Sequence, residues 1–252
     1  MESSMLLISI ASAWALLNLG RFLVPINSGF VVPISSEILF AIALVSFLCC
    51  PRMLPFLIAL VGPLLSLLYF KRSASNLILL KSFAYSVSMV VIAFVNYSYY
   101  STIESFVTGF IYPTPELIEL TLIVVSLTVL LKVFELPINF SLFDIEYSQI
   151  KGLMPRLWLA LVYTSSAYVG AQLAFFQGFL LAHVTSLSLL VVGYSIRNIK
   201  DEALTLIAFA LVNYLSGLYL PLAYSSAVSA IAVLLLQQAR FKALSNLRKT
   251  VV

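Results

Sequence analysis

Long apolar runs, separated by short stretches that contain proline or charged residues, dominate this sequence of 252 residues. A window of roughly 19 residues identifies such runs as helices that are long enough to cross a bilayer. Pro221 divides the last run in two, because proline cannot continue a helix. We therefore expect an all-α fold, a polytopic transmembrane helical bundle of about eight to nine spans. The predicted spans are Met5–Phe22, Ser35–Cys50, Met53–Phe70, Asn76–Tyr97, Leu117–Phe134, Leu157–Phe176, Phe179–Ile196, Ala203–Leu218 and Ala223–Gln238.

The composition supports one membrane domain over the whole chain. Hydrophobic residues make up 62% of the sequence and charged residues only 10%. Such a composition is typical of a chain surrounded by lipid, and the runs leave no room for a separate soluble domain. We therefore treat residues 1–252 as a single integral membrane domain. The first apolar run lacks a preceding basic segment, which favours a retained span over a cleaved signal peptide.

Lysine and arginine gather at alternate ends of the predicted spans. If the N-terminus lies outside, four basic clusters all fall on the cytoplasmic side, as the positive-inside rule favours, and Arg52 is the exception. This arrangement predicts a multi-pass protein of the cell membrane, with the loop 135–156 in the cytoplasm. It also explains the net charge of +4, because interfacial Lys and Arg residues hold the cytoplasmic loops on their side, so no nucleic-acid partner is expected. The four clusters are Lys71 and Arg72; Lys151 and Arg156; Arg197 and Lys200; and Arg240, Lys242, Arg248 and Lys249.

The segment from Phe134 to Gly152 is a polar island in this apolar chain. It carries Glu135, Asp144, Glu146 and Lys151. Carboxylates at a half-buried membrane edge can have raised pKa values and can pass protons near neutral pH. The alternative is that they form salt bridges with neighbouring basic residues or with a partner protein. Both roles, proton relay and docking, stay open.

Other charged residues interrupt or border the spans. Lys81 lies inside the predicted fourth span and Lys132 near the end of the fifth. Each lysine either extends its side chain to the interface or acts as an intramembrane cation beside a carboxylate. Asp201 and Glu202 open the eighth span, where acidic residues stabilise a helix N-terminus. A contact with a partner protein is the alternative for these two acids.

Residues suited to metal binding or covalent catalysis are few. Cys49 and Cys50 are adjacent, His183 is the single histidine, and no further cysteine completes a zinc or iron–sulfur site. The sequence has no phosphate-binding glycine loop and no nucleophile motif in a suitable context. We expect no catalytic residue, no metal ligand and no cofactor in this chain.

Three stretches resemble one family of membrane subunits. Glu135–Gly152, in which Glu146–Tyr147–Ser148 is followed by Lys151, resembles the cytoplasmic loop of the quinone-site (H-type) membrane subunit of respiratory complex I. The related membrane-anchor subunits of energy-converting membrane-bound [NiFe] hydrogenases share this pattern. Phe70–Ser88, which contains Lys81, and Tyr194–Phe209, which contains Asp201 and Glu202, are similar to two further junctions of the family. The resemblance covers residues 53–220, but the acid-rich loop is shorter here and the family's glutamate in the fourth span is absent.

The resemblance implies a non-catalytic subunit of an oxidoreductase complex. Such a subunit docks a soluble redox arm, made of an iron–sulfur small subunit and a large catalytic subunit, next to antiporter-like membrane subunits. The partners would carry the cofactors: iron–sulfur clusters, with or without a NiFe centre. Coupling of electron transfer to proton or ion translocation is the further role that the resemblance implies. Two alternatives stay open: a purely structural anchor, and a stand-alone small-molecule transporter, which predicts an inverted repeat with paired interrupted helices.

Overall fold

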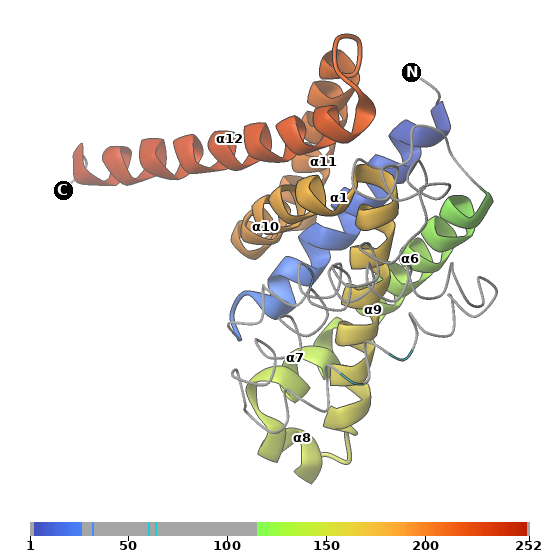
Figure 1. Cartoon of the computed structure of the whole chain (residues 1–252). Helices are drawn as coiled ribbons and strands as arrows, with labels where there is room; N and C mark the ends of the chain where they lie inside the picture. Colours follow the sequence, from blue (N-terminus) through green and yellow to red (C-terminus); the bar gives the residue numbers. More distant parts are fainter. Residues whose placement is uncertain (1–2, 27–31, 33–59, 61–63, 65–114, 251–252) are drawn as a thin grey trace.

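The computed structural model describes residues 3–26, 32, 60, 64 and 115–250, and the regular structure in these residues is entirely helical (Figure 1). The all-α fold class is therefore confirmed for the described part of the chain. The helices are α1 (Ser3–Leu23), α6 (Pro115–Val133), α7 (Glu135–Phe143), α8 (Ile145–Ile150), α9 (Pro155–Gln177), α10 (Phe179–Ser195), α11 (Ile199–Ser216) and α12 (Leu222–Thr250).

Six of the predicted spans coincide with helices, namely α1, α6, α9, α10, α11 and α12. The other three predicted spans, Ser35–Cys50, Met53–Phe70 and Asn76–Tyr97, lie outside the described residues. Among the described helices, α1 and α9 are long and apolar enough to cross a membrane. Helices α6 and α7 add a third candidate if the pair is one span with a bend of 75°. The described residues thus show membrane-type helices but two or three candidate spans, and not the eight to nine expected from the sequence.

Helix α1 lies at the centre of the described bundle, where it packs against α10, α6, α11 and α9. Its contact with α10 is the closest, because two glycines face the opposing backbone. A Cβ at Gly20 would overlap the carbonyl oxygen of Leu190, and a Cβ at Gly193 would overlap that of Leu17. Small residues allow such close packing of membrane helices. The pair of glycines therefore fixes how α1 and α10 cross.

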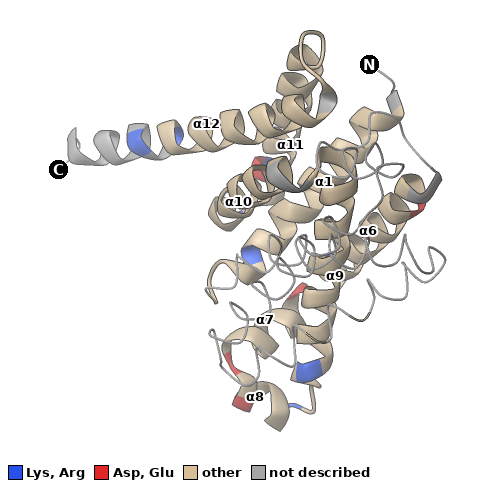
Figure 2. Cartoon of the chain, in the orientation of Figure 1, with Lys and Arg blue, Asp and Glu red and all other residues tan. Residues whose placement is uncertain are grey.

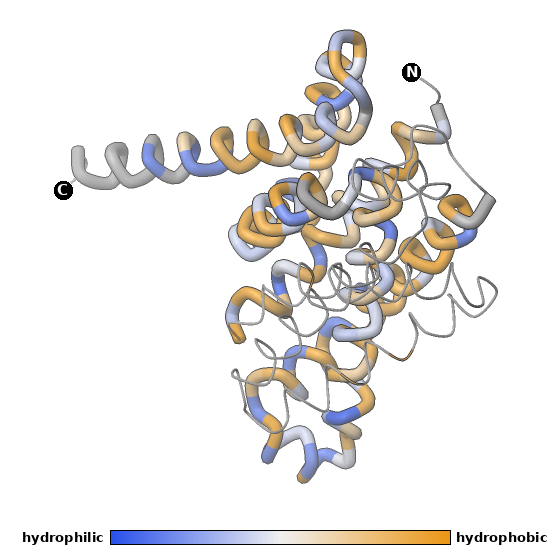
Figure 3. The backbone as a smooth tube through the Cα atoms, in the orientation of Figure 1, coloured by the Kyte–Doolittle hydropathy of each residue, from blue (hydrophilic) through white to orange (hydrophobic). Residues whose placement is uncertain are grey.

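Polar and apolar residues separate along the fold. Figure 3 shows long hydrophobic stretches in α1, α6 and α9, and Figure 2 shows charged residues on α7, on α8 and toward the C-terminal end of α12. In Figure 1, α7 and α8 lie at one end of the molecule, and α12 extends away from its body. Charged residues are thus found on these outlying segments, and Figure 2 also shows them on α1, α6 and α11 in the body of the fold.

The prediction of a loop after Phe134 is wrong, because α7 and α8 make most of this segment helical. Pro137 falls in the first turn of α7, where a backbone N–H has no partner within the helix, so proline is tolerated there. Asp144 ends α7, and its carboxylate accepts the backbone N–H of Tyr147 at 2.9 Å, which caps α8. Gly152, with a φ of 72°, ends the segment before α9 begins.

Candidate functional site

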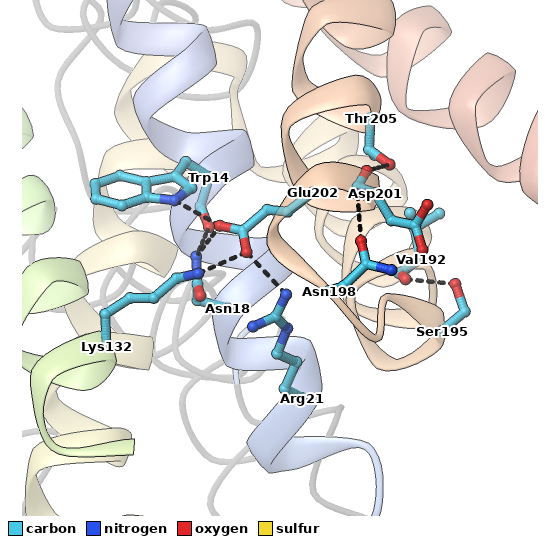
Figure 4. Close-up of polar contacts among 10 residues, drawn as sticks. All are labelled: Trp14, Asn18, Arg21, Lys132, Val192, Ser195, Asn198, Asp201, Glu202 and Thr205. Carbon is cyan, nitrogen blue, oxygen red and sulfur yellow. Dashed lines mark hydrogen bonds and ion pairs between the residues drawn. The ribbon is translucent and has the colours of Figure 1, made fainter. Parts of the chain in front are cut away.

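The strongest polar site in the described residues is built around the carboxylate of Glu202 in the first turn of α11 (Figure 4). Its Oε2 contacts the Lys132 Nζ at 2.6 Å and an Arg21 guanidinium nitrogen at 2.8 Å. Its Oε1 accepts the indole N–H of Trp14 at 2.8 Å and the amide of Asn18 at 3.3 Å. We call these five residues the Glu202 cluster.

Three helices bring the Glu202 cluster together. Trp14, Asn18 and Arg21 are spaced four and three residues apart, so they share one face of α1. Lys132 comes from the last turn of α6. Because the last turns of α1 and α6 meet the first turn of α11, the first two helices run in the same direction and α11 runs in the opposite one.

The electrostatics of the cluster depend on ionised Glu202. Its side chain is only 6% exposed, while those of Arg21 and Lys132 are 17% and 25% exposed. A buried carboxylate loses its hydration and needs charged partners and hydrogen bonds in return. Four donors from two helices supply them here. The carboxylate is therefore well suited to holding the helices together, and its burial removes it from any docking surface.

Asp201, next to Glu202, has a separate role at the surface. The Asn198 side chain caps α11 by accepting the Asp201 backbone N–H at 2.8 Å. The Asp201 carboxylate pairs with Arg240 of α12 at 3.0 Å, where the two side chains are 20% and 52% exposed. Both acids lie in the first turn of α11, as predicted from the sequence. Asp201 thus links α11 to α12, whereas Glu202 links α11 to α1 and α6.

The predicted residues of the polar island lie together on α7 and α8 or directly after them. Glu135 is in the first turn of α7, where it is partly buried, and Asp144 caps α8. Glu146 is exposed in the first turn of α8. The Lys151 ammonium lies 5.6 Å from the centre of the Tyr147 ring, within the range of a cation–π contact. Four of the seven predicted site residues are therefore neighbours here.

The structure pairs Lys132, a basic residue considered as a salt-bridge partner for the island, with an acid outside the island. Lys132 contacts Glu202 and not an acid of α7 or α8. This contact agrees with the alternative in which Lys132 is a cation beside a carboxylate, although the carboxylate is distant in sequence. Lys81 lies outside the described residues. Trp14, Asn18 and Arg21 were not identified from the sequence. Their common face on a largely apolar helix is the signal that could have found them.

A second buried polar group lies where the late turns of α9 and α11 meet the first turns of α1 and α12. The Asn213 amide donates to Ser9 at 2.7 Å and accepts the Ser225 hydroxyl at 2.6 Å. Ser226 contacts Ser9 at 3.1 Å and accepts the Gln177 amide at 2.6 Å. All five side chains are buried. We call this the neutral cluster, because none of its members carries a charge.

Metal binding has no support in the part of the chain that the structure describes. No group of three His, Cys, Asp or Glu side chains there is arranged to hold a metal ion. The Glu202 carboxylate is already occupied by four nitrogen donors. The arrangement of the Glu202 cluster serves to join helices and does not resemble a ligand set.

Comparison with known proteins supports the fold class. The sequence matches no protein-family model and no curated protein. Among solved structures, the fold is similar to that of PsaBC from Streptococcus pneumoniae in complex with Fab, with a TM-score of 0.69. The match covers 92% of this chain and 89% of that chain at 14% sequence identity. At this identity the likeness concerns the fold alone.

Proposed function

We propose that this chain is the multi-pass membrane subunit of a complex and that α7 and α8 bind a soluble partner. The observation that carries the proposal is the exposure of apolar side chains on these two helices. Ile150 is 82% exposed and Phe143 57%, and Phe140 and Tyr147 are more than one third exposed. Exposed apolar residues rimmed by charges are typical of a protein interface. We call the exposed side chains of residues 135–151, which comprise α7, α8 and the residues that border α8, the docking surface.

The docking surface is held rigidly on the bundle. Only Phe134 separates α6 from α7, and backbone hydrogen bonds continue through the bend. The Phe134 N–H donates to the Leu130 carbonyl, and the Ile138 N–H donates to the Phe134 carbonyl. Helix α7 also packs against α9. A partner bound to this surface would therefore act directly on two long helices of the bundle. The exposed Asp144 and Glu146 give it acidic positions for docking, for which buried Glu202 is unsuited.

For the membrane arrangement we propose eight to nine spans, with the N-terminus outside and the docking surface in the cytoplasm of the cell. The positive-inside distribution of Lys and Arg supports this orientation. The Glu202 cluster supports the order of the spans, because three helix ends that share one side in this arrangement also meet in the structure. In that arrangement the ends of α1 and α6 and the start of α11 all belong on the cytoplasmic side, and these are the ends that meet at Glu202.

The proposed partner is a soluble redox arm of iron–sulfur and catalytic subunits. Its support is the resemblance of residues 53–220 to membrane subunits of complex I and energy-converting hydrogenases. In this proposal the cofactors stay in the partners, and antiporter-like subunits lie beside the chain. A proton relay would use Glu135, which is partly buried at the base of the docking surface.

Transport of a small solute is the second candidate function, and two observations favour it. The bend of 75° between α6 and α7 is an interrupted helix of the kind found in transporters. The neutral cluster places polar side chains inside the bundle, and the Gln177 Oε1 in it accepts no hydrogen bond. A buried acceptor without a donor is costly, so such atoms often mark a site that binds a polar species.

Substitution of Ile150 tests the docking surface. The full chain, tagged and expressed in its native membrane, is purified in a mild detergent with its bound subunits. Ile150→Asp should abolish retention of the soluble partner, because it places a charge in an apolar interface. Ile199→Asp is the matched control: Ile199 is 77% exposed but lies on α11. Equal retention of the partner in both variants would contradict the proposal that α7 and α8 bind it.

The composition of the purified complex then identifies the partner. A redox arm predicts iron in the complex and an electron paramagnetic resonance signal from reduced iron–sulfur clusters. An iron-free complex that moves a solute across vesicles overturns the redox arm in favour of transport. A chain that purifies alone from its native membrane and moves a solute also contradicts the docking proposal.

A further inference from the structure

The contacts of the Glu202 carboxylate are unequal between helices. Trp14, Asn18 and Arg21 all come from α1, whereas Lys132 alone comes from α6. Helix α11 also packs against α1 along its backbone, but its backbone hardly contacts α6. Lys132 is thus the principal tie between α6 and α11 in the described structure, while α1 and α11 are joined by several contacts.

Release of Lys132 leaves a satisfied carboxylate. Without it, Glu202 keeps Arg21 on Oε2 and keeps two neutral donors on Oε1. Two cations on one oxygen repel each other, so departure of one strengthens the hold of the other. Lys132 is already one quarter exposed, and its flexible stem can carry the ammonium to water. Arg21, by contrast, belongs to α1, and Trp14 and Asn18 of the same helix also donate to Glu202. Release of Arg21 alone would therefore leave α1 joined to α11.

Lys132 is also placed to respond to the docking surface. It lies in the last turn of α6, two residues before Phe134, where the helix bends into α7. A change in the angle of α7 therefore moves the backbone at Lys132. Lys132 is also the member of the Glu202 cluster that lies closest in sequence to the docking surface.

We propose that Lys132 is a releasable tie, and that occupation of the docking surface controls whether α6 is joined to α11. This inference rests on the proposed docking function. The tie holds α6 against the α1–α11 pair in the unbound protein. Binding of a partner to α7 and α8 tilts the inner end of α6, breaks the Lys132–Glu202 contact and leaves the α1 contacts of Glu202 in place.

Distance measurement between spin labels tests the tie in the full chain. Labels are attached at Val129 of α6 and Ile199 of α11, both exposed and outside the docking surface, after Cys49 and Cys50 are replaced by serine. Double electron–electron resonance should give one narrow distance distribution for the labelled chain in which the Glu202 cluster is native. Lys132→Met should add a second, longer population, and Lys132→Arg should restore the narrow one. Arg240→Gln, which breaks the Asp201–Arg240 pair instead, should leave the distribution unchanged.

The outcomes separate the tie from the docking function. An unchanged distribution in folded Lys132→Met, with native helical circular dichroism, overturns the tie even if a partner binds. If Lys132→Met broadens the distribution but no partner co-purifies with the native chain, the tie is kept and docking is rejected. With the co-purified partner bound, the chain with native Lys132 should show the longer distance seen in Lys132→Met. An identical distribution with and without that partner overturns control by docking.

Discussion

The Glu202 cluster and the docking surface are two charged regions of the described structure that are built in opposite ways. The cluster gathers charges from distant parts of the chain and buries its carboxylate, while the docking surface keeps Asp144, Glu146 and Lys151 exposed within a few residues of one another. Buried charge must be matched within the protein, whereas exposed charge is matched by water. The cluster therefore determines how helices pack, and the docking surface remains free for another molecule.

Removal of the buried carboxylate should give the largest loss of stability. Glu202→Ala leaves Arg21 and Lys132 without their common partner, and removing one member of a buried ion pair costs about 3–5 kcal/mol. Because both cations are partly exposed, we expect about 3 kcal/mol, at the lower end of that range. The loss is measured as a shift in the denaturation midpoint on titration of mixed micelles with dodecyl sulfate.

Glu146→Ala is the matched control from the docking surface. Glu146 is exposed and forms no ion pair with another residue that the structure describes, so its substitution should shift the midpoint little. Equal shifts for Glu146→Ala and Glu202→Ala would show that the two regions do not differ in the way that their burial indicates.

Loss of the helix cap within the docking surface should have an intermediate effect. Asp144→Ala removes the acceptor for the Tyr147 N–H and should destabilise α8 by about 1 kcal/mol. The change concerns a short helix at the end of the molecule, so local opening should exceed global unfolding. Hydrogen exchange of residues 145–150 should accelerate, while α1 keeps its protection. Asp144→Asn, which retains an acceptor, should keep most of the protection.

The two regions also differ in how far they follow from the sequence. The helices themselves were predictable because each apolar run is local, and six of them lie where the runs place them. The grouping of Glu135, Asp144, Glu146 and Lys151 was predictable for the same reason. The helical form of that segment was not, because Pro137 and several polar residues also fit a loop.

The Glu202 cluster could not be predicted from the sequence, because a single sequence does not show which helices pack against one another. Arg21, Lys132 and Glu202 belong to three helices separated by long stretches of chain, and their meeting depends on which helices pack. Lys132 and Glu202 were each recognised as charged residues near the end of a span, but not as partners. The face shared by Trp14, Asn18 and Arg21 identifies one side of the cluster, and only the packing of α1 against α6 and α11 completes it.

Disruption of the exposed ion pair should give the smallest effect. Arg240→Gln breaks the contact of α12 with Asp201, in which the arginine is about half exposed. Exposed pairs contribute roughly 0–1 kcal/mol, since water and salt replace the lost partner. We expect a shift of at most about 0.5 kcal/mol, which added salt should reduce further. A loss as large as that of Glu202→Ala would contradict the surface role of the Asp201 pair and would extend the buried cluster to α12.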